Sequence, residues 1–179
     1  ETKKITVAAA QMDGPAYIRL ATGRVPEIYK EDYEFKIGKA VILKEGIDVC
    51  IISSGYIMHE VIKAADVAQN LGISVRLINL HTLKPIDEEI IVQSAREIGA
   101  VLTVEEHSLF GGLGSFVASV LARDNISGLR FKMMGLDKFP YGYGSYDEMK
   151  SMNGLSKEHI LSQIKLLHES KKNIFSAEL

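Results

Sequence analysis

The sequence predicts an α/β fold, and the stretch from Gly46 to Asp87 contains the observations that predict it. Residues 48–53 form a short apolar run without polar alternation, as in a strand that is buried on both faces of a parallel sheet. An apolar stripe at helical spacing follows between Ile57 and Leu71, and a second apolar run occupies residues 73–80. Because a helix between two strands of one sheet requires a right-handed crossover, this stretch is predicted to be a parallel βαβ unit.

Three further apolar runs predict three more strands, at residues 39–44, 100–104 and 129–136. A helix is predicted to begin after Asp87, which is a favourable N-cap residue, and to end at Gly99. We expect these elements to add strands to the sheet of the βαβ unit and helices to its faces.

Serine residues predict the starts of the last two helices. Ser145 and Glu148 have the spacing of a capping box. Ser156 precedes a helical pattern whose apolar residues recur through Leu167, and we expect the chain to fray from Lys171 onward.

The beginning of the chain is predicted to lie outside this domain. Residues 2–11 have a short helical pattern, residues 13–15 are a turn signal, and residues 16–20 alternate as in a strand. Because the chain begins inside a helical pattern and without Met, we expect it to be a fragment of a longer polypeptide or a processed product. The predicted division is the tail of a preceding domain, a polar linker and the main domain, at residues 1–20, 21–36 and 37–179.

The composition argues against nucleic-acid and membrane partners. The net charge of the 179 residues is -2 and the Lys and Arg residues are scattered, which excludes a strongly basic surface. No apolar run is long enough to cross a bilayer, and no secretory signal opens the sequence. Cys50 is the single cysteine, so the sequence offers neither a disulfide framework nor a zinc cluster. We therefore expect Cys50 to be a buried core residue and the protein to be cytoplasmic.

One candidate functional segment begins with Glu105, Glu106 and His107, which follow a predicted strand and precede the glycine-rich segment Gly111–Ser115. Open α/β sheets bind ligands at the carboxyl ends of their strands. Adjacent carboxylates can raise one another's pKa, and a histidine can carry a proton. However, strand alternation would send Glu105 and Glu106 to opposite faces. The alternatives are a catalytic site, an interface, and a capped loop with hydrogen-bonded carboxylates.

A second candidate is the loop from Lys138 to Tyr146, in which aromatic residues alternate with glycines. Aromatic residues are enriched in the cores of protein interfaces. A third place, Ser53-Ser54-Gly55, has the position of an anion-binding turn but lacks the spacing of a dinucleotide or Walker loop, so a plain turn is favoured. The interface candidates from the first two places are Glu105, Glu106, His107, Gly112, Gly114, Phe139 and Tyr143.

The order and spacing of several short motifs resemble the C-terminal third of the transketolase family. The motifs are Gly14–Leu20, Gly46–Val49 with Ser54-Gly55, Leu71–Ile73, Leu83–Asp87, Thr103–His107, Gly112–Ser115, Gly135–Asp137 with Phe139, and Gly154-Leu155. Each motif is weak alone, but the series covers nearly the whole chain. The resemblance implies a three-layer αβα domain with a mostly parallel five-stranded sheet, in which residues 39–44 form an antiparallel edge strand.

The resemblance also implies an activity for the complete enzyme. Transketolases use thiamine diphosphate and a divalent metal, here expected to be Mg²⁺, to transfer a two-carbon ketol unit between sugar phosphates in the pentose phosphate pathway. This chain has no Gly-Asp-Gly metal–diphosphate motif, and it lacks the part of the pyrimidine-binding domain that holds the activating carboxylate. We therefore expect the chain alone to be inactive, with no catalytic residue, no bound metal and no cofactor.

The implied partners are a second copy of the same chain, the N-terminal diphosphate-binding section of the enzyme and, in the complete enzyme, a sugar phosphate. The implied contact with the substrate phosphate is Arg24, for which a solvated linker residue is the alternative. Because both candidate loops follow parallel strands, we predict that this end of the sheet packs against a second copy or against the pyrimidine domain.

Two other functions are weighed against this one. Within enzymes, the alternative is the corresponding domain of a 2-oxoacid dehydrogenase beta subunit or of 1-deoxyxylulose-5-phosphate synthase. Outside enzymes, the alternative is a free-standing interaction module that binds a partner or a small anion.

Overall fold

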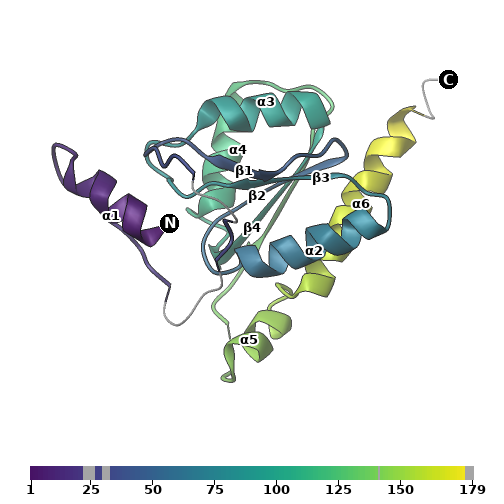
Figure 1. Ribbon diagram of the computed structural model, residues 1–179. Helices are drawn as coiled ribbons and strands as arrows, with labels where there is room; N and C mark the ends of the chain where they lie inside the picture. The colour runs from purple at the N-terminus through teal and green to yellow at the C-terminus, as the bar shows by residue number, and fades with distance from the viewer. Residues whose placement is uncertain (22–26, 30–32, 141, 176–179) are drawn as a thin grey trace.

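The computed structural model describes residues 1–21, 27–29, 33–140 and 142–175. A five-stranded sheet with the order β1-β3-β2-β4-β5 lies between two layers of helices (Figure 1). β1 pairs antiparallel with β3 at one edge, whereas the other pairs are parallel. These findings confirm the three-layer, mostly parallel fold and the antiparallel edge strand. The strands are β1 (Val41–Lys44), β2 (Val49–Ser53), β3 (Val75–Asn79), β4 (Ala100–Ser108) and β5 (Arg130–Leu136).

The helices cover both faces of the sheet. α2 (Met58–Asn70) and α6 (Lys157–Phe175) pack on one face, and α3 (Glu88–Ile98) and α4 (Leu113–Arg123) pack on the other (Figure 1). The short helix α5 (Tyr146–Met152) lies at the end of the sheet to which β5 leads. α1 (Thr2–Ala10) is set apart at the side of the sheet (Figure 1). None of the described helices is long and apolar enough to cross a membrane.

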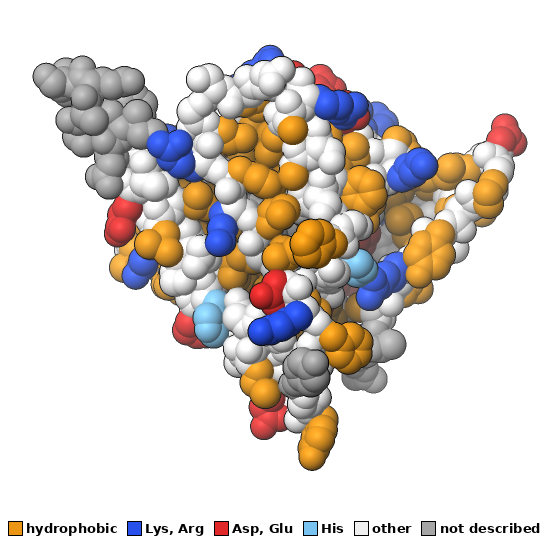
Figure 2. All heavy atoms as spheres, turned by 180° about the vertical axis from the view of Figure 1, so that it is seen from behind, with side chains coloured by type: hydrophobic (Ala, Val, Ile, Leu, Met, Phe, Trp, Pro, Cys, Tyr) orange, Lys and Arg blue, Asp and Glu red, His pale blue; other side chains and the backbone are white. Residues whose placement is uncertain are grey.

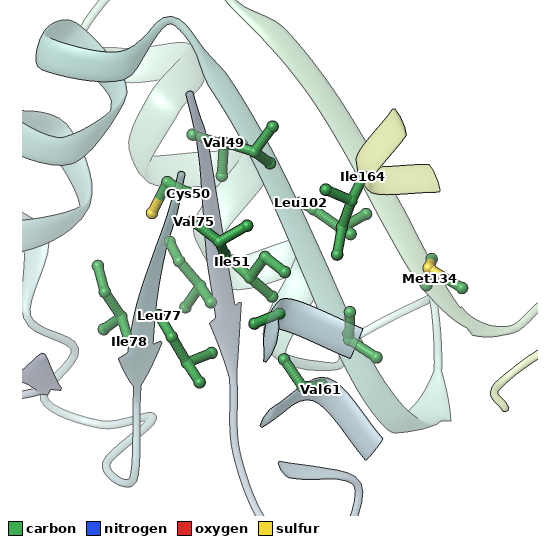
Figure 3. Packing of buried hydrophobic residues seen from close by; sticks show 14 of the residues in the cluster. Val49, Cys50, Ile51, Val61, Val75, Leu77, Ile78, Leu102, Met134 and Ile164 are labelled. Carbon is green, nitrogen blue, oxygen red and sulfur yellow. The ribbon is translucent and has the colours of Figure 1, made fainter. Parts of the chain in front are cut away.

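The central strands form the core because their apolar residues are buried on both faces. Every residue of β2 is buried, as the unbroken apolar run predicted. Ile51 and Leu102 lie on the side of the sheet where Val61 and Ile164 pack from α2 and α6 (Figure 3). Cys50 points to the opposite side, toward Ser94 of α3, and burial raises the pKa of its thiol to about 12. The cysteine is therefore a core residue, as predicted.

Several helix ends follow the predicted local signals. α3 ends at Gly99, which has the left-handed conformation (φ 71°) that glycine adopts without strain. Ser145 and Glu148 form the predicted capping box at the start of α5, in which each side chain hydrogen bonds with the backbone of the other residue.

Asp87 stands at the N-cap of α3, but its side chain makes no capping hydrogen bond. Its carboxylate instead accepts hydrogen bonds from the backbone N–H of Ala40 (2.9 Å) and from Nζ of Lys39 (3.4 Å). The predicted capping role is thus wrong, because the approach of the edge segment gives the buried carboxylate other donors. Asp87 links α3 to the start of β1.

Two strand predictions also differ from the structure. β4 continues through Ser108, so Glu105, Glu106 and His107 lie inside the strand rather than after it. The seven residues of β5 extend this pairing, with Ser108 opposite Leu136 after an irregularity in the register. Residues 16–20, predicted as a strand, form none, because no described strand lies beside them to pair with their backbone. The predicted linker, residues 21–36, lies partly outside the described residues.

Candidate functional site

The candidate site lies at the carboxyl ends of β2, β4 and β5, where the loops leave the sheet on the side of α5. Because β4 and β5 are parallel, the glycine-rich segment and the aromatic loop leave the sheet at this same end, as predicted. Hydrophobic side chains stand exposed at this lower end of the molecule (Figure 2). Lys and Arg side chains are scattered on the face in view rather than gathered in one patch (Figure 2).

Glu105 is buried on the α4 side of β4, with 5% of its surface exposed. Its carboxylate accepts hydrogen bonds from the backbone N–H groups of Leu113 (2.7 Å) and Gly114 (2.8 Å), the first two residues of α4. The first N–H groups of a helix have no partner within the helix, and an anion there also interacts favourably with the helix dipole. Glu105 therefore fixes the start of α4 on the sheet.

The two predicted glycines allow this close approach of α4 to β4. A Cβ on Gly112 would lie 2.0 Å from Oε2 of Glu105 and 2.6 Å from the carbonyl oxygen of Ser108. A Cβ on Gly114 would lie 2.8 Å from Oγ1 of Thr103. Real Cβ atoms do not make contacts this short. Glycine is therefore needed at both positions for α4 to pack against β4 within the chain.

Glu106 lies on the other side of β4 and is half-buried. Its carboxylate accepts a hydrogen bond from the phenol of Tyr146 at the start of α5. Burial raises the pKa of Glu106 above its ordinary value, although Lys150, a hydrogen bond with the backbone of Ile57, and Arg19 act in the opposite direction. The raised pKa thus comes from desolvation and not from Glu105, because strand alternation separates the two carboxylates.

His107 returns to the α4 side of the strand but is exposed, and its Nδ1 lies 3.2 Å from the carbonyl oxygen of Ser108. The consecutive residues Glu105, Glu106 and His107 therefore do not form one group around a common point. A site that uses all three side chains together is not present in this arrangement.

The aromatic residues at this end are unusually exposed for their size. Phe110 and Phe139 expose 83% of their surface and Tyr143 exposes 98%. Tyr146 differs, since its ring packs edge-on against Tyr56 at 4.5 Å between centroids. Single exposed apolar residues need no explanation, but three nearly bare aromatic rings at one end of a sheet are typical of an interaction surface.

The remaining predicted positions have simpler roles or lie outside the described residues. Ser53 is buried and donates a hydrogen bond from Oγ to the carbonyl oxygen of Val104 (2.7 Å), which ties β2 to β4 in a plain turn. Arg24 is among the residues that the structure does not describe.

The part of the chain that is described does not fit a thiamine diphosphate–metal site. Within it, no three His, Cys, Asp or Glu side chains come together as metal ligands would. Mg²⁺ is held by oxygen ligands, usually carboxylates together with phosphate and water. We therefore derive no chemical step through the cofactor from this chain.

An ionic cluster between α2, α5 and α6 was missed from the sequence. Glu60 of α2 contacts Nζ of Lys150 (3.2 Å) and accepts a hydrogen bond from the backbone N–H of Lys157 (3.1 Å) at the start of α6. The side chains of Lys150 and Glu60 expose only 8% and 12% of their surface. Because these residues are far apart in the chain, no spacing in the sequence predicts that they meet.

Comparison with known proteins places this geometry in a family. Residues 38–160 match the family described as "Transketolase, C-terminal domain". The chain is 37% identical over 173 residues to a putative transketolase C-terminal section from Methanocaldococcus jannaschii, covering 96% of this chain and 53% of that protein. It is 39% identical over 149 residues to a 6-deoxy-6-sulfo-D-fructose transketolase subunit from a Clostridium species, covering 83% of this chain and 46% of that protein.

Solved structures agree with this assignment. A split-gene transketolase, described as an inactive beta4 tetramer, superimposes with a TM-score of 0.88 at 36% identity and covers 95% of this chain and 55% of that one. The transketolase of Leishmania mexicana shares the fold, with a TM-score of 0.56 at 14% identity over 74% of this chain and 18% of that one. The chain spans about half the length of the curated relatives it matches. By sequence and by fold, the chain belongs to the transketolase C-terminal domain family.

Proposed function

We propose that this chain is the C-terminal section of a transketolase and that it has a structural, assembly-forming role in an enzyme that transfers a two-carbon ketol unit between sugars. The observation that carries the proposal is the match of nearly the whole chain to a split-gene transketolase. Some relatives, such as one from Phocaeicola vulgatus, are named as a single subunit of an apulose-4-phosphate transketolase, and such a name implies a partner subunit.

In this proposal the cofactor and the metal belong to the assembled enzyme. Thiamine diphosphate and Mg²⁺ would be held by the N-terminal section and the pyrimidine domain, since the described residues offer no group of metal ligands. We expect the chain alone to be inactive and to give no heat in a calorimetric titration with thiamine diphosphate and Mg²⁺. Binding at micromolar concentrations would contradict this.

The exposed aromatic end of the sheet is proposed as an interface with a second copy of the chain or with the pyrimidine domain. The support is the exposure of Phe139 and Tyr143 at the end of the sheet where Glu106, His107, Gly112 and Gly114 also lie. We further propose a cytoplasmic enzyme of carbohydrate metabolism, in the pentose phosphate pathway, with neither nucleic acid nor membrane as a partner. A net charge of -2 supports the exclusion of nucleic acid.

The test reconstitutes the full-length protein with its N-terminal section and measures ketol transfer. The donors are a ketose phosphate, a sulfonated ketose and a 2-oxoacid, each offered with an aldose phosphate acceptor. The sulfonated sugar is included because one relative is named for such a substrate. Turnover of a ketose donor supports the proposal, whereas turnover of the 2-oxoacid alone would identify a 2-oxoacid dehydrogenase instead. A protein that assembles with no such section would favour the free-standing module.

The interface has its own test in the same reconstituted enzyme. Tyr143→Ala and Phe139→Ala remove exposed rings and should weaken association, which sedimentation at low protein concentration measures. If both variants associate as the wild type does while Glu106→Gln abolishes turnover, the interface proposal is wrong and Glu106 is catalytic.

A further inference from the structure

α5 needs an explanation for its fixed position, because hydrophobic burial does not supply one. None of its hydrophobic residues is buried, although the side chain of Lys150 is largely enclosed. A helix of seven residues is too short to be stable alone in water. Its capping box satisfies the first N–H groups but does not attach the helix to the rest of the domain. Its last turn is joined to the core by the buried Leu155, whose backbone N–H donates to the carbonyl oxygen of Lys150 (2.9 Å). Its first turn is attached by side chains that reach from α5 to the sheet and to α2.

Two side chains of α5 make such contacts. The phenol of Tyr146 donates to the carboxylate of Glu106 on β4, and its ring packs against Tyr56 at the turn before α2. Lys150, one helical turn later, contacts Glu60 of α2 at 3.2 Å and also lies 5.1 Å from the centre of the Tyr146 ring. Tyr146 is therefore the residue that couples the start of α5 directly to the sheet.

Glu106 is suited to hold this phenol. A hydrogen bond to an ionised carboxylate is stronger than one between neutral groups. Glu106 comes from the end of β4, where pairing with β2 has stopped at Val104. The strand pairs with β5 at Val104 before Glu106 and at Ser108 after it, so β5 holds the backbone on either side of this residue. The described residues Gly142 to Ser145 directly precede Tyr146, so the position of this end of the aromatic loop depends on where the Tyr146 side chain is held.

The geometry points to Glu106 as a positioning residue: its carboxylate holds the Tyr146 phenol and so fixes the start of α5 and the residues just before it, Gly142–Ser145, on the end of the sheet. Glu105, its neighbour, performs the equivalent task for α4 on the opposite face. The value of a fixed loop for assembly rests on the interface proposed above, whereas the anchoring itself does not.

The experiment measures amide hydrogen exchange by mass spectrometry in the full-length protein, on peptides that cover residues 142–152 and 113–123. The variants are Glu106→Leu, Tyr146→Phe and the double variant. Each single variant should speed exchange in residues 142–152 roughly tenfold or more, as expected for the loss of one hydrogen bond to a charged group. The double variant should exchange no faster than the singles, because both remove the same bond.

Two controls separate positioning from a general loss of stability. Glu106→Gln keeps an acceptor oxygen and should restore most of the protection that Glu106→Leu loses. Glu105→Gln should speed exchange in residues 113–123 and leave residues 142–152 unchanged. Unchanged exchange at 142–152 in Glu106→Leu, additive effects in the double variant, or equal acceleration of both segments would overturn the inference.

The outcome can be told apart from that of the proposed interface. Association of Tyr143→Ala tests the interface without touching the Glu106–Tyr146 bond. If Tyr143→Ala associates normally but Glu106→Leu and Tyr146→Phe speed exchange as expected, the positioning role is supported and the interface proposal is wrong. If Tyr143→Ala weakens association while Glu106→Leu leaves exchange at 142–152 unchanged, the interface stands and the positioning role is wrong.

Discussion

Glu105 and Glu106 are neighbours on β4, but they face two different surroundings. On the α4 side, Glu105 is buried, and glycines bring the helix so close that a Cβ on Gly112 would lie 2.0 Å from its carboxylate. On the α5 side, Glu106 is half-buried and contacts Tyr146 of a helix that has no buried hydrophobic residue. The same residue type thus lies in a closed contact on the α4 side of the sheet end and in a more open contact on the α5 side, where we propose that a partner packs.

The difference shows that the structural role of a carboxylate depends on which hydrogen-bond donors pack against it. Glu105 meets two backbone N–H groups, which are fixed by a helix, whereas Glu106 meets a phenol on a side chain that can rotate. We call the α4 side of the sheet end the closed side and the α5 side the open side. We therefore expect substitutions on the closed side to lower the free energy of unfolding more than matched substitutions on the open side. The predictions below test this difference.

The largest effect is expected for Gly112→Ala. The new methyl group would overlap the Glu105 carboxylate and the carbonyl oxygen of Ser108, so α4 must move or the carboxylate must lose its hydrogen bonds. We expect a loss of about 3 kcal/mol in the free energy of unfolding, measured by urea denaturation. The matched control is Gly144→Ala on the open side, where the nearest atom is Oε2 of the exposed Glu148 at 3.0 Å. Equal losses for the two variants would contradict the comparison.

Glu105→Gln should have the next largest effect. The amide can accept from only one of the two N–H groups, and its own NH₂ would face the other donor in a buried place. We expect a loss of about 2 kcal/mol in the same urea experiment. Glu106→Gln should change the free energy of unfolding by less than about 0.5 kcal/mol, because the amide keeps an acceptor oxygen for the Tyr146 phenol and removes a charge that burial disfavours. A larger loss for Glu106→Gln than for Glu105→Gln would reverse our assignment of the closed and open sides.

The sequence predicted the features that depend on local pattern. The buried run of β2, the stripe of α2 and the turn at Gly99 each follow from a few adjacent residues, so the fold and the family could be inferred without coordinates. The capping box at Ser145 succeeded for the same reason, because both partners lie within four residues.

The failures involve partners that are distant in the chain. β4 runs on through Glu105 and Glu106 because β5 continues beside it, and neither residue's own neighbourhood contains that information. The contact of Glu106 with Tyr146 spans forty residues, and that of Glu60 with Lys157 spans ninety-seven. A sequence pattern identifies such residues as candidates but does not say which partner each one finds.

Asp87 extends the comparison to a second buried carboxylate near the α3–α4 face. Since its oxygens accept from the backbone of Ala40 and from Lys39, Asp87→Ala should lose about 1.5 kcal/mol in the free energy of unfolding. Asp87→Asn keeps one acceptor oxygen but loses the charge, so its loss in the free energy of unfolding should exceed half of that for Asp87→Ala. If Asn instead matches the wild type, Asp87 behaves as a simple N-cap after all.

The smallest effect concerns pH and the open side. Burial holds the pKa of Glu106 above its ordinary value of 4.5, with Lys150 and Arg19 opposing the shift. A carboxyl whose pKa is raised in the folded state favours folding when protonated, and this contribution is lost as the pH rises from 4.5 through the raised pKa. Glu60 has the opposite sign: burial alone would raise its pKa, but hydrogen bonds with Lys63 and Lys150 outweigh it and lower the pKa.

The measurement is therefore a difference between two proteins rather than one curve. The free energy of unfolding of the wild type minus that of Glu106→Gln should fall as the pH rises above 4.5, because groups such as Glu60 contribute equally to both and cancel. The fall should be smaller than the losses expected above, since a half-exposed group is partly screened by water. A difference that rises with pH over this range would mean that the Tyr146 phenol and Lys150 outweigh burial, and that Glu106 sits in a closed site like that of Glu105.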